Sequence, residues 1–411
     1  MYIYLFIILI IIFIYYYLSN KENFKYSEIF LNNLQLNENI KILKIQKSIN
    51  YNNKLIRSRV GSNILYNIFN KLNGKYYTII RYPDFINEIK RHSFNNLHNY
   101  FKFLKKNIIK KNINYIFDFT GYHGVFDNKV RLWIKLKNKY GRNTANKIMG
   151  TTHLIPNDKT LFFKNFSNKS KYIMKNSFGG ARTGLTITND KNEIANIFNT
   201  CKIDPEKCID AACHRKTKYN IIQNFIEPSF FVNGHKFGLR LFLILIYKNN
   251  KLESFIYKDG FCYYTLQKYQ KNSMHLDKNI VPTTKRLNDF IIENKLPYTY
   301  IEFAKYIKKI DKNYLKKFNN LENILKEYCK KIVESNKDDI YEFYNNENVN
   351  NFSIYAMDID IDKDFKPSIF ESNYYFAYTK SLRKDVFINM YNDIFYKLGL
   401  SNKEVNGMMY F

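Results

Sequence analysis

The sequence predicts a mixed α/β (α+β) fold, and three stretches of the chain carry that prediction. Apolar and polar residues alternate with period two between residues 355 and 373, which is typical of strands with one buried face. Apolar runs separated by turn residues fill 219–266. Residues 300–345 instead show the three- and four-residue spacing of helices. A chain of 411 residues, 18% of them aromatic, is long enough for two or three packed lobes.

The first segment of the chain is apolar. Residues 1–18 carry no charged side chain and are about long enough to cross a bilayer. A cleaved signal peptide would have a basic start and small residues at its cleavage site, and both are missing, so the segment is predicted to be a transmembrane helix that anchors the chain. Lys21 and Lys25 follow it, which places the body of the protein in the cytoplasm by the positive-inside rule. Residues 19–55 are polar and are expected to form a tether.

The next two segments are predicted to be separate lobes. Residues 56–150 should form an N-terminal α/β lobe, in which "NYIFDFTGY" reads as a strand and "VRLWIKLKNKYG" as a helix closed by Gly141. Residues 151–225 should form a central lobe. In it, "TTHLIPNDKTLFFKNF" predicts a strand, a turn and a helix, and "KYIMKNSFGGARTGLTIT" predicts two strands joined by a glycine-rich loop.

Residues 226–411 are predicted to form a C-terminal lobe. Its strands should turn at "NG", "KNN" and "KDG". Helices over 300–345 and the acidic segment 355–373 follow, and "DVFINMYNDIFYKLGL" predicts a last helix.

The acidic segment predicts a hairpin that faces two carboxylates. Pro367 and the residues before it interrupt the alternation, so a turn centred on Asp364 and Phe365 would set Asp358 opposite Glu371. The same pattern places Ile369, Glu371 and Asn373 on one face. Directly opposed like charges repel, so a cation is expected between them, and Mg²⁺ is commonly held by one or two carboxylates plus nucleotide phosphates.

Two basic segments could hold those phosphates. Lys175 ends an apolar strand, and Gly179, Gly180, Arg182 and Gly184 follow, so that backbone N–H groups and cations could surround an anion. A glycine-rich hairpin without a ligand is the alternative for this segment.

The second basic segment is "HKFGLRLFL". Its alternation sets Lys236, Gly238 and Arg240 on the face opposite the core. A solvated basic strand edge is the alternative here.

In order along the chain, "HLIPND", "YIMKNSFGGARTGLTI", "IIQNFIEPSFFVNGHKFGLRLFLIL", "IYKDGFCYYTL" and "YAMDIDIDKDFKPSIFESN" resemble motifs of the tubulin–tyrosine ligase-like family, a branch of the ATP-grasp ligases. The resemblance covers about residues 115–385. It implies an ATP-grasp fold, with the nucleotide held between two α/β lobes, and ATP and Mg²⁺ as cofactors.

The resemblance also implies a role for each matching residue. The implied ATP-binding residues are Lys175, Gly179, Gly180, Arg182 and Gly184 at the phosphates and Gln223, Asn224, Phe225 and Ile226 along the adenine. The implied catalytic residues are Lys236 and Arg240, and the implied Mg²⁺ ligands are Asp358, Glu371 and Asn373.

Two residues depart from the family pattern. Gly238 stands where the family has Asp, and Tyr263 stands where it has Arg. The resemblance makes the first hypothesis an ATP-dependent ligase that joins an amino acid to a protein carboxylate, such as an acidic tubulin tail, through an acyl phosphate. The two departures motivate a second hypothesis, a membrane-tethered protein with an inactive ligase fold that binds ATP or an acidic partner.

The formal net charge of +29 suits an acidic protein partner. A codon bias toward Lys, Asn, Ile, Tyr and Phe would give the same composition. Nucleic acid is the least expected partner, because the aromatic residues are spread along the chain and form no RNA-stacking motif. Cys201, Cys208 and Cys213 match no common zinc spacing and are expected to be incidental thiols.

Overall fold

The structure is a computed structural model. It describes residues 48–51, 54–57, 70–72, 75–81, 113–118, 126, 128–176, 184–201, 204, 218–227, 231–279, 285–344, 350–362, 365–373, 384–399 and 407–410. Among these residues, no helix has the length and apolar character needed to span a membrane. The predicted anchor, residues 1–18, lies outside the described residues.

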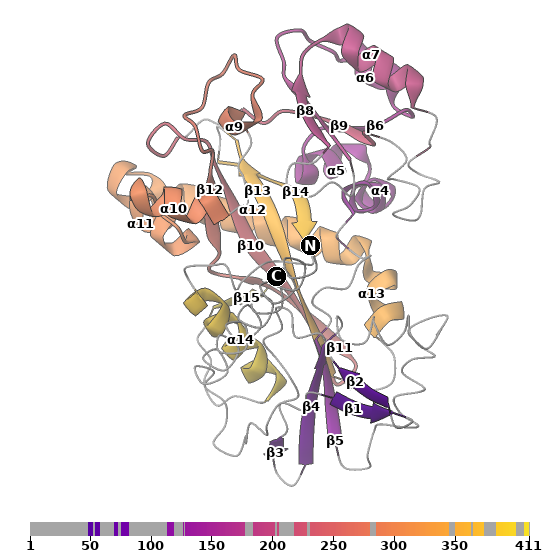
Figure 1. The fold of residues 1–411 in the computed structure, drawn as a ribbon, viewed down its shortest axis with the longest axis vertical. Helices are drawn as coiled ribbons and strands as arrows, with labels where there is room; N and C mark the ends of the chain where they lie inside the picture. Colours follow the sequence, from indigo (N-terminus) through magenta and orange to yellow (C-terminus); the bar gives the residue numbers. More distant parts are fainter. Residues whose placement is uncertain are drawn as a thin grey trace, which may run out of the picture.

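A large sheet forms the centre of the molecule (Figure 1). Its strand order is β15-β11-β10-β13-β5-β4-β3, with β12 also paired to β10 and β14 to β13. The strands are β3 (Asn70–Leu72), β4 (Lys75–Arg81), β5 (Ile113–Asp118), β10 (Phe237–Lys248), β11 (Lys251–Tyr257), β12 (Phe261–Tyr264), β13 (Asn350–Ile361), β14 (Pro367–Asn373) and β15 (Met408–Tyr410). Nearly every residue of β10 and β13 is buried, because other strands pair with both of their edges and helices cover the sheet.

A second sheet of four strands lies apart from the first and has its own core (Figure 1). Its order is β6-β9-β7-β8, from β6 (Thr152–Leu154), β7 (Tyr172–Lys175), β8 (Leu185–Thr188) and β9 (Ile221–Asn224). Helices α6 (Lys159–Lys164) and α7 (Lys191–Thr200) pack on it through Phe162 and Phe198, whose rings lie 5.5 Å apart. A separate two-stranded sheet joins β1 (Ser48–Tyr51) and β2 (Lys54–Arg57).

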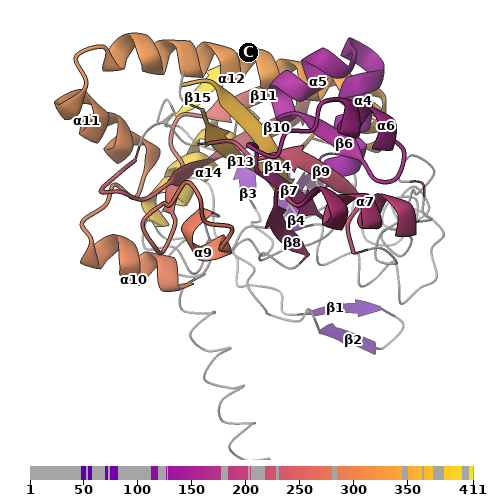
Figure 2. The ribbon, with the colours of Figure 1, turned by 90° about the horizontal axis from the view of Figure 1, so that it is seen from above.

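Most of the remaining helices contribute buried residues to the core of the large sheet. They are α4 (Lys129–Tyr140), α5 (Arg142–Met149), α10 (Lys285–Glu293), α11 (Tyr300–Ile310), α12 (Tyr314–Ser335), α13 (Lys337–Tyr344) and α14 (Lys384–Leu398). The short helix α9 (Leu276–Asn279) lies near α10 (Figure 2). Helix α12 contacts α4 as well as β11 and β14, and α5 also packs against β14. The α4–α5 pair therefore lies beside the acidic hairpin.

The predicted mixed α/β class is confirmed, and so are the main elements. Helix α4 ends at Gly141, whose φ of +83° is a backbone conformation that glycine adopts readily and other residues rarely do. The "KNN" turn joins β10 to β11 through Asn249 and Asn250, both with positive φ as a tight hairpin requires. Cys201 takes part in no disulfide within the described part of the chain, while Cys208 and Cys213 lie outside the described residues.

Candidate functional site between the two sheets

The acidic hairpin has the predicted pair of opposed carboxylates. Asp358 of β13 lies directly opposite Glu371 of β14, and on its other side it faces Arg240 of β10. Asn373 lies opposite Ala356 and donates from Nδ2 to Asp358 Oδ2 at 3.0 Å. We call the face of the large sheet that carries Arg240, Asp358 and Glu371 the site face.

The prediction that Ile369 shares a face with Glu371 is wrong. The pairing shifts by one residue between Asp358 and Ile359, so that Ile359 faces Ile369 and Phe370 is an extra residue. Such a bulge reverses the alternation of side chains along one strand. Ile369 is therefore buried in the core with Ile359, while Phe370 and Glu371 remain beside the site.

Each carboxylate on the site face is paired with one cation. Arg240 donates to both oxygens of Asp358, from Nε at 2.6 Å and from a terminal nitrogen at 2.7 Å. Burial raises the pKa of Asp358, and Arg240 offsets part of that rise, since a buried carboxylate is costly without a facing cation.

The other two pairs come from elements that are distant in sequence. Lys236 Nζ lies 2.9 Å from Asp360 Oδ2, and Lys129 Nζ lies 2.9 Å from Glu371 Oε1. Both lysines are nearly fully buried. Lys129 and Asp360 were missed by the sequence analysis.

Lys175 is a fourth cation at the site, beside the three that are paired with carboxylates. Among the described residues it forms no ion pair, and its Nζ lies 4.8 Å from the centroid of the Phe370 ring across the gap between the sheets. The pKa of Lys175 is lowered to about 8, first by burial and then by the nearby Lys129, while Glu371 and Asp360 act in the opposite direction. Among the described residues of the site, four cations thus face three carboxylates, and the surplus charge belongs to Lys175.

Helix α4 brings Lys129 to the site. Asn128 caps the helix by accepting hydrogen bonds from the N–H groups of Val130 and Arg131, so Lys129 is its first residue. A cation in the first turn opposes the helix dipole, and no acid accompanies it there. The ion pair with Glu371 offsets that unfavourable placement.

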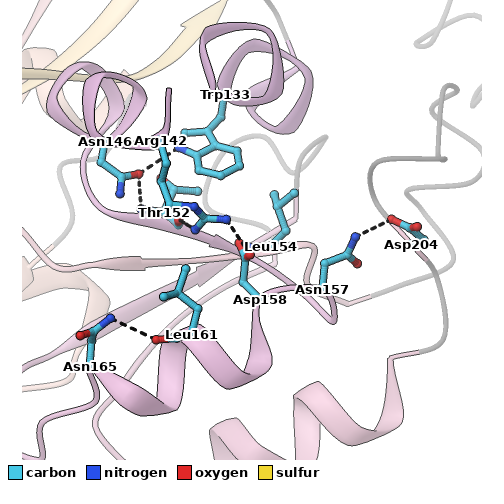
Figure 3. A network of polar contacts seen from close by, with 10 residues as sticks. All are labelled: Trp133, Arg142, Asn146, Thr152, Leu154, Asn157, Asp158, Leu161, Asn165 and Asp204. Atoms are coloured by element: carbon cyan, nitrogen blue, oxygen red, sulfur yellow. Dashed lines mark hydrogen bonds and ion pairs between the residues drawn. The ribbon is translucent and has the colours of Figure 1, made fainter. Parts of the chain in front are cut away.

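A polar network ties the α4–α5 pair to the small sheet (Figure 3). Asn146 Oδ1 accepts from Trp133 Nε1 at 3.1 Å and from the Thr152 N–H at 3.2 Å. Arg142 donates to Asp158 at 2.6 Å, and the same carboxylate accepts from the Leu154 N–H. The "HLIPND" segment therefore connects the helix that carries Lys129 to the sheet that carries Lys175.

The segment predicted to run along the adenine begins inside the small sheet. Gln223 pairs with both β6 and β7, and its side chain donates to Met149 O and Thr152 Oγ1. The N–H of Asn224 donates to Thr151 O, and that of Phe225 donates to Lys171 O. The segment leaves the sheet at Ile226, whose carbonyl accepts from Lys236 Nζ at 3.4 Å.

Two buried lysines contact Phe225, where the chain leaves β9. The ammonium groups of Lys171 and Lys236 lie 4.3 Å and 4.5 Å from the centroid of the Phe225 ring. Lys171 also pairs with Glu227 at 3.2 Å and donates to Tyr269. The structure thus brings the exit of β9 next to the cations of the site.

The glycine-rich loop is described only at its ends. Gly184 has a φ of +70°, and its carbonyl accepts from the Asn176 N–H next to Lys175. The predicted residues Gly179, Gly180 and Arg182 lie outside the described residues.

Comparison with known proteins gives a family for this architecture. The model of the tubulin-tyrosine ligase family matches residues 93–400, which is well over half of the chain. The chain belongs to the tubulin-tyrosine ligase family. The resemblance noted in the sequence is thereby confirmed, and the motifs that carried it include the strands and the hairpin that form the site.

Individual relatives within the tubulin-tyrosine ligase family are distant. The chain is 22% identical over 264 residues to the probable tubulin polyglutamylase ttll-9 of Caenorhabditis elegans, covering 61% of this chain and 58% of the relative. It is 25% identical over 223 residues to the probable tubulin polyglutamylase TTLL9 of Rattus norvegicus, covering 52% and 46%. The chain thus spans about half the length of these curated relatives.

The hairpin carries side chains of the kind that bind a hard cation, and its two opposed carboxylates are here paired with Arg240 and Lys129. Two carboxylates and an amide lie on adjacent positions of paired strands, and oxygen ligands are those that Mg²⁺ prefers. In the part of the chain that the structure describes, no group of three or more His, Cys, Asp or Glu side chains is arranged to hold a metal. An ion bound by Asp358, Glu371 and Asn373 would therefore take its other ligands from water and from a phosphate.

Proposed function

We propose that the chain is an ATP-dependent ligase that joins an amino acid to a carboxylate of a protein. The observation that carries the proposal is Lys175, a buried cation that lacks an ionic partner among the described residues while each neighbouring carboxylate has one. A buried unpaired charge is costly unless a ligand compensates it. A polyphosphate placed between the two sheets would supply that compensation, and ATP is the polyphosphate that the family membership favours.

The residues of the site have separate tasks in this proposal. Lys175 and the glycine-rich loop bind the ATP phosphates from the small sheet, and the segment from Gln223 to Ile226 borders the adenine. Lys236 and Arg240 hold the transferring phosphoryl group from the large sheet. Mg²⁺ held by Asp358, Glu371 and Asn373 would neutralise negative charge on the phosphates.

The proposed reaction has two steps. An oxygen of the acceptor carboxylate attacks the γ-phosphorus of ATP, which forms an acyl phosphate and releases ADP. The amine of the incoming amino acid then attacks the acyl carbon, an amide bond forms, inorganic phosphate leaves, and the amine loses a proton. The protein's contribution is to position the groups and to neutralise the charge on the transferring phosphoryl group, which buried cations do more effectively than exposed ones.

The relatives favour a tubulin tail as the acceptor. Both are named as probable tubulin polyglutamylases, which makes glutamate the first amino acid to test. The formal net charge of +29 suits an acidic polypeptide.

The test is a transfer assay with the full chain, ATP, Mg²⁺, labelled amino acids and acidic tubulin-tail peptides. The proposal expects label in the peptide, with one ADP and one phosphate released per amide formed. Lys175→Met should abolish transfer, while Lys164→Met, an exposed lysine on α6, should leave transfer unchanged.

An inactive ligase fold is the second candidate, motivated by Gly238 and Tyr263. It predicts Mg²⁺-dependent ATP binding in the wild type without any transfer or ATP hydrolysis across the whole panel of amino acids. A transfer activity that Asp358→Ala removes would exclude it.

A further inference from the structure

Gly238 and Tyr263, the two departures from the family pattern, are direct cross-strand partners. In the pairing of β10 with β12, Gly238 lies opposite Tyr263, and both belong to the site face. Replacements at two opposed positions affect the same space, because opposed Cβ positions are about 5 Å apart. The two departures are therefore one structural change.

The ring of Tyr263 lies on the same face of the sheet as Gly238, which has no side chain to meet it. The same-face diagonal neighbours of Tyr263 on β10 are Lys236 and Arg240, at a distance that an aromatic side chain can reach. The ring lies with its centroid 5.1 Å from Cζ of Arg240. A side chain at position 238 would project from that same face, directly beside the Tyr263 side chain.

Arg240 is thus held from two directions. Asp358 accepts two hydrogen bonds from the guanidinium, and the Cζ atom of Arg240 lies over the ring of Tyr263. A guanidinium can do both at once, because it donates hydrogen bonds in its plane and can contact an aromatic ring through its face. The side chains of Arg240 and Asp358 are each 12% exposed, so little water competes with either contact.

We propose that Tyr263 is a positioning residue for Arg240, and that Gly238 is the matching replacement that gives its ring access to the guanidinium. This inference rests on the proposed function for its catalytic consequence, since Arg240 is there assigned to the transferring phosphoryl group. In this proposal, Gly238 and Tyr263 together keep Arg240 in the position that catalysis needs, so the two departures do not indicate a loss of activity.

The test combines turnover with a spectroscopic measurement on the full chain. Tyr263→Leu removes the ring and should lower kcat about tenfold with a smaller change in the KM for ATP, as expected for the loss of one desolvated cation–π contact. Gly238→Val should have the same effect by displacing the ring. Tyr263→Phe, which keeps the ring, should restore most of the turnover, and Tyr396→Leu on α14 is the control for the same exchange outside the site.

A double-mutant cycle separates positioning from a general packing role. In an Arg240→Lys background, Tyr263→Leu should have little further effect on kcat, because the planar group that the ring orients is gone. Equal losses in both backgrounds would overturn the proposal, and so would a Tyr263→Phe variant as slow as Tyr263→Leu.

The Nε–H signal of Arg240 in the NMR spectrum of arginine-labelled protein gives a reading that needs no turnover. It should be protected from solvent exchange in the wild type and in Tyr263→Phe, and exchange faster in Tyr263→Leu, because the ring no longer shields and orients the guanidinium that Asp358 binds. Unchanged protection in Tyr263→Leu would contradict the proposal. If the exchange is faster as expected but the wild type transfers no amino acid, the proposed function fails while the positioning of Arg240 stands.

Discussion

The ammonium group of Lys175 lies 4.8 Å from the centroid of the Phe370 ring, so the end of β7 in the small sheet meets the bulge of β14 in the large sheet. Phe370 provides a ring but no negative charge. The other charged groups near the buried Lys175 are two lysines and two carboxylates, and these four already form the pairs Lys129–Glu371 and Lys236–Asp360. The predictions below follow from that arrangement.

Replacing Lys175 by Met should weaken ATP binding at least tenfold, because hydrogen bonds to a charged group contribute about 1.5–3 kcal/mol each. The same change should raise the free energy of unfolding of the ligand-free protein, on the order of 2 kcal/mol, since it removes a buried charge without an ionic partner among the described residues. Calorimetric titration and denaturant unfolding measure the two effects. Lys164→Met is the exposed control, and a Lys175→Met protein that is less stable than wild type would contradict the assignment.

The stability of the ligand-free protein should depend on the titration of Lys175. Its pKa in the folded protein is about 8, below the ordinary value of 10.5, so the unfolded chain binds more protons between these values. The free energy of unfolding should therefore rise with pH from about 8 to 10.5, relative to Lys175→Met measured at each pH.

ATP binding should show the reverse dependence on pH. A bound phosphate favours the charged form of Lys175, so binding at a pH near 8 should take up a proton and weaken as the pH rises further. Titrations in buffers of different ionisation enthalpy detect that uptake. Equal proton uptake in wild type and Lys175→Met would show that another group is responsible.

Glu371→Gln should remove the Mg²⁺ dependence of ATP binding, because it deletes one of the two carboxylates of the proposed site. It should also lower the free energy of unfolding by about 2–4 kcal/mol, since Lys129 would remain buried without its partner. Asp339→Asn is the control, because Asp339 pairs with Arg131 and Lys135 of the same helix α4 but outside the site. That variant should bind Mg-ATP like wild type.

Lys129→Met should destabilise the protein alone but not in combination with Glu371→Gln. Each single change leaves a charge without its partner, whereas the double change leaves neither. The coupling free energy from the cycle should be about 2 kcal/mol or more. Additive effects would mean that the Lys129–Glu371 pair does not form in solution.

The pattern of the acidic segment was sufficient to predict a hairpin with Asp358 opposite Glu371, because Pro367 and the residues before it interrupt the alternation and so indicate where the chain turns. It could not predict the bulge at Phe370, which inserts one residue without changing the composition and reverses the face of Ile369. The alternation of residue types predicts which face of a regular strand each side chain is on. The position of a bulge depends on the tertiary packing of both faces of the strand, which the alternation does not contain.

Lys129 illustrates the other limit of the sequence. Its partner Glu371 is 242 residues away, and in a chain with 65 Lys and Arg no local pattern distinguishes one buried lysine from its solvated neighbours. Lys236 and Arg240 could be selected because strand alternation placed them opposite an apolar face. Lys129 needed the three-dimensional contact between α4 and β14.

The measurement that tests the account most directly is a titration of the full chain with ATP, with and without Mg²⁺, beside Lys175→Met. The account predicts binding that Mg²⁺ strengthens in the wild type and that is at least tenfold weaker in Lys175→Met. A wild-type protein that unfolds cooperatively, and is therefore folded, but binds no ATP in the presence of Mg²⁺ would contradict the claim that the two sheets enclose a nucleotide site.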